Sequence, residues 1–412
     1  MARLPSTSVD PAIDAAALLR RIGFIGLFVI MPVAAQVARR AVVILAPISI
    51  ALLLLASAID GRARPVRPAS TRLLRSPAFL AGCLVILWSA LSLVWTPFLS
   101  LATERLLNVI ATLLMTMAAY LALPDRMRSA NLYLLPVGVA AAAIFAIGLG
   151  LTGQGPFGQG LLGPDEDAIL DRGLILLILF VWPAVSWLRS RGRNGEALGL
   201  ALLVSVALLV SPGPTTLVAL AVGAIAFALA TFRPMLTPRL LGVTAATLLV
   251  LGPVLPFIAR PIGATVFGGR APGVLSLKAW QTIVTGEPLR LVTGHGLETA
   301  LRGRYVNLLP INAPRTLLFE LWYELGLVGA FAAAFALHAA IRRAGREASV
   351  LVPGAMAAFA SAFLIACIGV GMTVMWWLTT LALAVLVFVA VERGQFRTRR
   401  PKASLLPSAQ KA

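Results

Sequence analysis

Three ionisable residues stand close together inside an apolar stretch late in this sequence. The stretch APRTLLFELWYELGLVG, residues 313–329, has Arg315 near its start and carries Glu320 and Glu324 among apolar residues. Thr316 and the two glutamates recur every four residues, so an α-helix places them on one face. Ionisable side chains in membrane segments usually face a bundle interior or a water-filled cavity. We therefore predict that this face lines a polar cavity; in the alternative, the glutamates only pair with arginines of other helices.

A further candidate, Arg172, opens the apolar stretch LDRGLILLILFVWPAVSWL. A guanidinium group can donate two parallel hydrogen bonds, which suits a phosphate group, and we predict that Arg172 binds one. The alternative is an interfacial arginine that extends its head group into water, paired with Asp171. His295 lies between two glycines in TGHGLET, residues 293–299, and glycines let a backbone approach a ligand closely. A plain turn with an exposed histidine explains this motif equally well.

The composition indicates what kind of molecule must position these residues. Of the 412 residues, 59% are hydrophobic and only 12% are charged, whereas about 25% of a soluble domain is charged. The chain is therefore predicted to be a polytopic membrane protein. Its net charge of +19 is attributed to Lys and Arg retained on the cytoplasmic side of a membrane, so no nucleic-acid partner is expected.

Apolar runs of the length that a membrane helix needs divide the chain. We predict an all-α bundle of about twelve transmembrane helices, a single integral-membrane domain over residues 1–412 with both termini cytoplasmic. The predicted spans lie near 22–38, 41–58, 78–95, 106–124, 132–152, 173–188, 198–211, 216–232, 240–258, 317–341, 351–371 and 373–391. In this register the cytoplasmic segments hold 24 of the 35 Lys and Arg residues, which fits the positive-inside rule.

One connection departs from that charge rule. The predicted large periplasmic loop 259–316, between the ninth and tenth helices, carries seven basic residues and only two acidic ones, Glu287 and Glu298. Long connections are uncommon unless they are functional. Residues 278–284 are expected to form a short amphipathic helix on the membrane surface, and residues 392–412 a basic cytoplasmic tail.

Several kinds of chemistry are disfavoured by the absence of their motifs. The sequence has no phosphate-binding P-loop, dinucleotide fingerprint or Gly-x-Ser-x-Gly elbow, which argues against ATP hydrolysis and redox chemistry. Cys83 and Cys367 lie in separate apolar runs, and His295 and His338 are the only histidines. We therefore expect neither a metal site nor a cofactor.

Several of these stretches resemble the O-antigen ligase and polymerase superfamily of bacterial membrane glycosyltransferases. WYELGLVGA, residues 322–330, is similar to the Glu-Leu-Gly-x-x-Gly signature that follows a large periplasmic loop in that family. TGHGLET is similar to its preceding Gly-x-Gly element, and LDRGLILLILFVWPAV to its arginine-bearing span. MTVMWWLTTLALA, residues 372–384, resembles the closing helix. The resemblance covers most of the chain.

The resemblance implies a function. Family members transfer a glycan from an undecaprenyl-pyrophosphate carrier to an acceptor hydroxyl at the periplasmic face. The chain is thus expected in the bacterial inner membrane, in cell-surface polysaccharide synthesis such as that of lipopolysaccharide, with a lipid or saccharide acceptor. Preorganised cations can neutralise the leaving pyrophosphate without a metal, and the candidates are Arg172, Arg270, Arg290, Arg315 and, near the position of the family's second arginine, Lys278. The attacking hydroxyl needs a proton acceptor, and the candidates are His295, Glu298, Glu320 and Glu324.

The sequence departs from the family pattern at one motif. Where the family commonly has Pro-His-Asn, with a histidine thought to assist the acceptor, this chain has Pro314-Arg315-Thr316. Arginine stays protonated, so we expect Arg315 to bind an anion and Glu320, one turn nearer the outer face than Glu324, to accept the proton. Two alternatives remain: a catalytically silent relative that binds lipid-linked glycan or scaffolds its assembly, and a transporter or flippase of that glycan.

Overall fold

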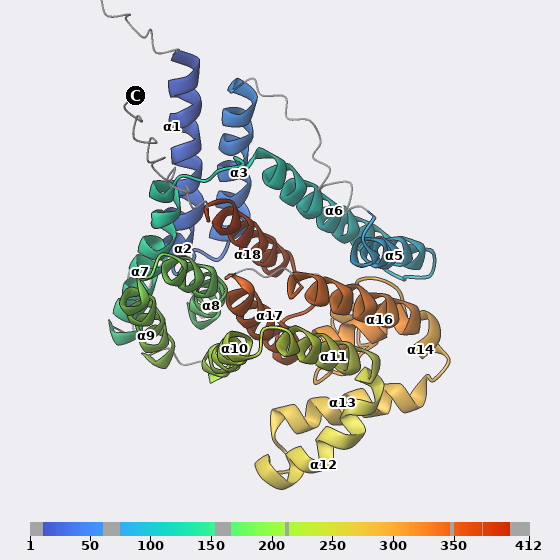
Figure 1. The fold of residues 1–412 in the computed structure, drawn as a ribbon. Coiled ribbons are helices and arrows are strands. Elements are labelled where there is room, and N and C mark those ends of the chain that lie inside the picture. The colour runs from blue at the N-terminus through green and yellow to red at the C-terminus, as the bar shows by residue number, and fades with distance from the viewer. Residues whose placement is uncertain are drawn as a thin grey trace, which may run out of the picture.

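The computed structural model describes residues 11–60, 75–152, 166–210, 214–346, 350–372 and 374–395. Within these ranges the chain forms helices and no strand (Figure 1), which confirms the all-α class. The helical segments in chain order are α1 (Pro11–Ile25), η1 (Gly26–Ile30), α2 (Met31–Ala34), α3 (Ala41–Ile59), α5 (Pro77–Leu91), η2 (Ser92–Val94), α6 (Leu99–Ala122), α7 (Ser129–Thr152), α8 (Glu166–Ser190), α9 (Asn194–Val210), α10 (Pro214–Phe232), α11 (Leu236–Val250), η3 (Gly252–Val254), α12 (Leu255–Phe267), α13 (Pro272–Gly286), α14 (Arg290–Thr293), α15 (Thr299–Arg302), α16 (Leu317–Ala344), α17 (Val352–Ile368) and α18 (Met375–Arg393).

Nine helices in the described part of the chain are long and apolar enough to cross a membrane. The pair α11 and α12 passes the same test but is bent by 65°, and α9 and α17 are shorter apolar helices of 17 residues each. Each predicted apolar run falls on one of these helices or on the bent pair. The molecule therefore has the architecture of a multi-pass membrane protein, with nine or ten helices of spanning length.

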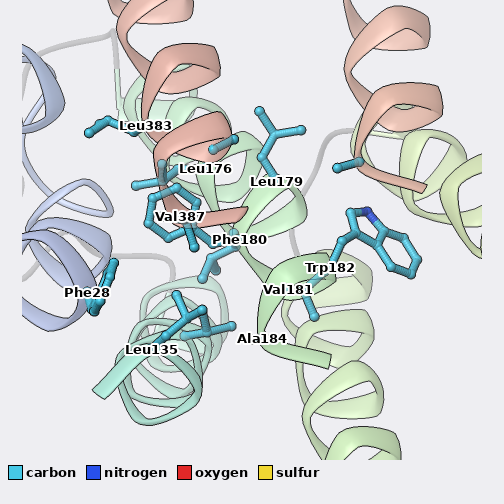
Figure 2. Close-up of a cluster of buried hydrophobic side chains, with 14 of the residues drawn as sticks. Phe28, Leu135, Leu176, Leu179, Phe180, Val181, Trp182, Ala184, Leu383 and Val387 are labelled. Carbon is cyan, nitrogen blue, oxygen red and sulfur yellow. The ribbon is translucent and has the colours of Figure 1, made fainter. Parts of the chain in front are cut away.

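Helix α8 lies at the centre of the bundle. In its most apolar window 89% of the residues are buried, against 50% or less in every other long apolar helix. Because α8 is apolar on all sides, each of its faces can bury apolar surface against a neighbour, and α7, α9, α17 and α18 pack around it. Figure 2 shows α8 side chains beside those of three other segments: Phe28, Leu135, Leu383 and Val387.

The predicted ninth span, 240–258, is not one straight helix. It breaks at Gly252-Pro253, where proline removes a backbone N–H and crowds the preceding turn, and α12 then continues to Phe267. The indole Nε1 of Trp322 donates to the Leu249 carbonyl oxygen at 2.6 Å, just before the break. The predicted loop 259–316 therefore begins inside a helix, and the short helix predicted within it is part of α13.

The connections at one end of the bundle are tied to one another. A guanidinium nitrogen of Arg191 donates to the carbonyl oxygen of Gly394 at 2.8 Å, and one of Arg393 donates to the carbonyl oxygen of Leu123 at 2.6 Å. The connections from α6 to α7 and from α8 to α9 thus lie beside the end of α18. All three belong to the segments that charge assigns to the cytoplasm.

We predict that Gly195 and Tyr305 lie on opposite sides of the membrane, because the basic segments and loop 259–316 fall on opposite sides of the predicted register. Gly195→Cys and Tyr305→Cys, each made after Cys83 and Cys367 are replaced by alanine, should react with an impermeant thiol reagent from opposite faces of sealed vesicles. Leu107→Cys, on the exposed apolar side of α6, is the unreactive control. Labelling of both test positions from one face contradicts the topology.

Candidate functional site

The Glu-Leu-Gly signature marks a break in helix α16. Gly326 has a φ of 62° and a ψ of −157°, a backbone conformation that is essentially restricted to glycine. The break leaves the carbonyl groups of the preceding turn without their helical partners. Other donors replace those partners: His295 N–H to the Tyr323 carbonyl at 2.8 Å, Gly296 N–H to that of Glu324 at 3.0 Å, and Trp88 Nε1–H to that of Leu325 at 2.8 Å.

The TGHGLET segment is docked into this break. Gly294 has a φ of 72°, and a Cβ atom there would lie 2.2 Å from the carbonyl oxygen of Glu324. On its other side Leu297 is held by the end of α5, because its N–H donates to Ser92 Oγ at 3.2 Å and its carbonyl accepts from Thr96 Oγ1 at 2.9 Å. Gly294 thus admits the backbone of α16 and Gly296, with a φ of 98°, admits Thr96, so no ligand is needed to explain the two glycines.

His295 is oriented by backbone. Its ring stacks on Tyr323 with the centroids 4.0 Å apart, and Nδ1 lies 3.0 Å from the Tyr323 carbonyl oxygen. Nε2 lies 2.9 Å from the carboxylate of Glu287. Arg290 and Trp280 line the same small pocket of about 20 Å³. Both ring nitrogens thus contact oxygens that accept hydrogen bonds, which orients the ring; Nε2 can act as a proton acceptor only where the exposed Glu287 side chain moves away from it.

Glu298 is the most completely paired charge of the region. Its side chain is 1% exposed, and its two carboxylate oxygens accept from Arg105 Nε at 3.1 Å and Nη2 at 3.2 Å. Arg302, one turn further along, lies 3.6 Å away. This bidentate pair joins the docked segment to α6 and neutralises a carboxylate that has no access to water.

The two glutamates of α16 bind backbone from two different segments. The Glu320 carboxylate accepts from the Met372 N–H at 2.6 Å, and that of Glu324 accepts from the Ala300 N–H at 3.0 Å. Both are buried, at 6% and 2% exposed. Within the described ranges neither makes an ion pair with an arginine, so the pairing alternative is not what the structure has.

The start of α16 brings two arginines together. Thr316 caps the helix, since its Oγ1 accepts from the Phe319 N–H at 3.3 Å. Arg315, just before the cap, is exposed. Arg304 is buried and donates from Nη2 to the Pro314 carbonyl oxygen. The charges of both arginines act on Glu320, so these three groups form one cluster.

The remaining sequence candidates are spread over the same part of the fold. Arg172 lies on α8 with its guanidinium 5.2 Å from the ring centre of Trp376, at the start of α18. Arg290 shares the small pocket with His295. Arg270 and Lys278 are exposed on α12–α13 and make no ion pair within the residues that the structure describes. The structure therefore brings Arg315 and Glu320 together at the start of α16, places Glu324 and His295 near the Gly326 break of the same helix, and leaves Arg270 and Lys278 apart.

Two residues that the sequence did not single out belong to the site. Arg105 lies just before the predicted fourth span and was counted only as a charge, and Arg304 was one of seven basic residues in the loop. The sequence marks their acidic neighbours, because Glu287 and Glu298 are the only acidic residues of loop 259–316, but it carries no signal for Arg105 itself. Both glutamates prove to be paired, with His295 and with Arg105 respectively.

A large apolar cavity adjoins the cluster. It has a volume of about 660 Å³ and lies between α8, α16, α17 and α18. Leu317 and Met372 line it beside Glu320, and Ala344 and Glu392 line it at the other ends of α16 and α18. Glu392 is the only charged residue of the lining. The cavity thus reaches residues at both ends of α16, Leu317 and Ala344.

Comparisons with models of protein families, with curated proteins and with solved structures found no match to this chain.

Proposed function

We propose that this chain is a membrane glycosyltransferase that moves a glycan from an undecaprenyl-pyrophosphate carrier to a hydroxyl of a lipid or saccharide acceptor. The observation that carries the proposal is the meeting of charged groups at the start of α16, where Arg304, Arg315 and Glu320 form one cluster. The docked His295 segment lies further along the same helix, at the Gly326 break. Twelve spans with loop 259–316 on the periplasmic side, in the bacterial inner membrane, complete the proposal.

The donor has an anionic head and a long hydrocarbon chain, and the site has a part suited to each. Arg315 and the start of α16 offer positive charge to the pyrophosphate, since a helix N-terminus favours anions. The apolar cavity that begins at Leu317 and Met372 suits the isoprenoid chain, because burial of apolar chain is favourable and needs no polar partners. Arg172 is a second cation in this region, because its guanidinium lies beside Trp376 at the start of α18, one of the helices that line the cavity.

The reaction is one substitution at the anomeric carbon. The acceptor hydroxyl oxygen forms a bond to that carbon while the bond from the carbon to the pyrophosphate oxygen breaks. The electron pair leaves with the carrier pyrophosphate, whose charge the arginines stabilise. We assign the hydroxyl proton to Glu320, because this carboxylate belongs to the cluster with Arg304 and Arg315 at the start of α16. His295 is the second candidate, and its Nε2 would accept the proton after the exposed Glu287 side chain moves away from it.

Purified protein in lipid vesicles should release polyprenyl pyrophosphate from a lipid-linked glycan donor when an acceptor is present. We expect Arg315→Ala and Glu320→Gln to lower the rate at least 100-fold, because each removes a charge at the reacting atoms. Arg172→Lys keeps its charge but loses the planar fork and should lower donor affinity at least tenfold. Arg239→Ala, at the start of α11, is the matched control and should transfer at the wild-type rate.

The same assay separates the alternatives. Wild-type rates in both Arg315→Ala and Glu320→Gln would refute a catalytic role for the start of α16, and wild-type donor affinity in Arg172→Lys would refute the role of Arg172 in donor binding. A wild-type chain that binds donor but releases no pyrophosphate is the silent scaffold, a reading that the engagement of both Glu320 and Glu324 by backbone amides favours. Movement of intact donor across the vesicle bilayer, without release, identifies a flippase.

A further inference from the structure

Arg304 is a buried cation that makes no ion pair with any residue that the structure describes. Its residue is 7% exposed, and Nη2 donates to the carbonyl oxygen of Pro314. Nε and Nη1 are shielded from solvent and have no hydrogen-bond partner in the described part of the chain. Burial lowers the pKa of the Arg304 guanidinium, and the positive charge of Arg315 lowers it further. The group nevertheless stays protonated, as arginine does in proteins.

The carboxylates around Arg304 do not neutralise it directly. Glu298 is held by Arg105 and Arg302, and Glu320 accepts from a backbone N–H. Across the described ranges neither Arg304 nor Arg315 takes part in an ion pair. A buried charge costs several kcal/mol unless it is paired and hydrogen-bonded. Two neighbouring cations with free donors therefore form an arrangement that an anion would stabilise.

The surroundings favour one class of anion. Arg315 is exposed and stands directly before the cap of α16, and the unbroken first part of that helix, Leu317–Leu325, directs its positive end toward the pair. Arginine side chains and a helix N-terminus together match the several oxygens of a phosphate group, each of which accepts hydrogen bonds. A simple halide would leave most of these donors unused.

We propose that Arg304 and Arg315, with the N-terminus of α16, form a binding site for a phosphate-type oxyanion. Arg304 supplies its unpaired Nε and Nη1 to the anion and keeps its Nη2 bond to Pro314. The identity of the natural anion as the carrier pyrophosphate rests on the proposed function; the anion site itself does not. The phosphate contact that we predicted for Arg270 and Lys278 is thereby assigned to Arg304.

The test uses inorganic pyrophosphate as the probe, titrated calorimetrically into the full-length protein in detergent. Wild-type protein should bind it saturably, and Arg304→Met and Arg315→Ala should each weaken binding at least tenfold. Arg304→Lys, which keeps the charge but has fewer donors, should bind with intermediate affinity. Arg239→Ala should bind as wild type. A polyprenyl pyrophosphate in the same micelles should compete with the probe. Competition indicates a lipid head group as the natural ligand, and its absence indicates free pyrophosphate.

Stability provides the second readout. Because Arg304→Met replaces an unpaired buried charge by an apolar side chain, its unfolding midpoint without ligand should equal or exceed that of wild type, so the loss of binding cannot be attributed to misfolding. No saturable binding by wild type, or wild-type affinity in folded Arg304→Met, would overturn the anion site. If that result is found but wild-type protein still transfers glycan, the anion site is refuted and the proposed function is not. If Arg304→Met loses anion binding but wild-type protein transfers no glycan, the anion site is supported and the proposed function is refuted.

Discussion

Glu298→Gln is expected to destabilise the protein by about 3–5 kcal/mol, the usual cost of breaking one side of a buried ion pair. The substitution keeps the shape of the side chain and removes its charge. Arg105, whose guanidinium bonds both carboxylate oxygens, then loses the charge of Glu298 at a site where the replaced side chain is 1% exposed. The free energy of unfolding in mixed detergent and dodecyl sulfate micelles measures the change.

Two controls make the Glu298 result specific. Glu196→Ala removes an ion pair with Arg193 that lies at the surface, with both side chains more than 40% exposed, and should leave the unfolding free energy unchanged within error. Adding Arg105→Met to Glu298→Gln removes both charges and should cost less than the sum of the single changes. A Glu298→Gln protein as stable as Glu196→Ala, or strict additivity in the double variant, contradicts the assignment.

The helical class and the positions of the helices follow from the sequence because each apolar run is a local signal. A bilayer requires about 20 apolar residues in every span, so hydropathy alone locates them. Hydropathy does not locate bends in the same way, because Gly252-Pro253 stands within one continuous apolar run. Only the packing of Trp322 against α11 shows how the chain turns there. The described ranges have nine or ten helices of spanning length, and the predicted count of twelve also includes the short helices α9 and α17.

The candidate site was predictable only where its residues are neighbours in sequence. The four-residue spacing placed Thr316, Glu320 and Glu324 on one helix, and they do lie there. Their partners come from other segments: Met372 for Glu320 and Ala300 for Glu324. Arg105 is 193 residues from Glu298, and no periodicity connects positions so far apart. Long-range pairs of this kind require the folded arrangement.

Gly326→Ala is expected to disrupt the docking of the TGHGLET segment and to destabilise the protein strongly. Its φ of 62° and ψ of −157° lie where residues with a Cβ atom cost about 1–3 kcal/mol from the backbone alone. An added Cβ would also lie 2.6 Å from the Gly294 nitrogen and 2.6 Å from the Val292 carbonyl oxygen. Both contacts are to backbone, which cannot rotate away as a flexible side chain could. The segment must therefore move, and the hydrogen bonds at the break are lost with it.

A helical glycine without these constraints provides the matched control. Gly148 lies inside α7, and an added Cβ would meet no other atom within 4 Å. Gly148→Ala should therefore stabilise the protein by about 0.5–1 kcal/mol, since alanine loses less conformational freedom in a helix. Hydrogen exchange of the His295 and Gly296 amides gives the local readout, because these N–H groups bond the carbonyls at the break. Faster exchange of both in Gly326→Ala and unchanged exchange in Gly148→Ala is the expected result. Wild-type protection of both amides in Gly326→Ala would show that the Glu-Leu-Gly break does not hold this segment in place.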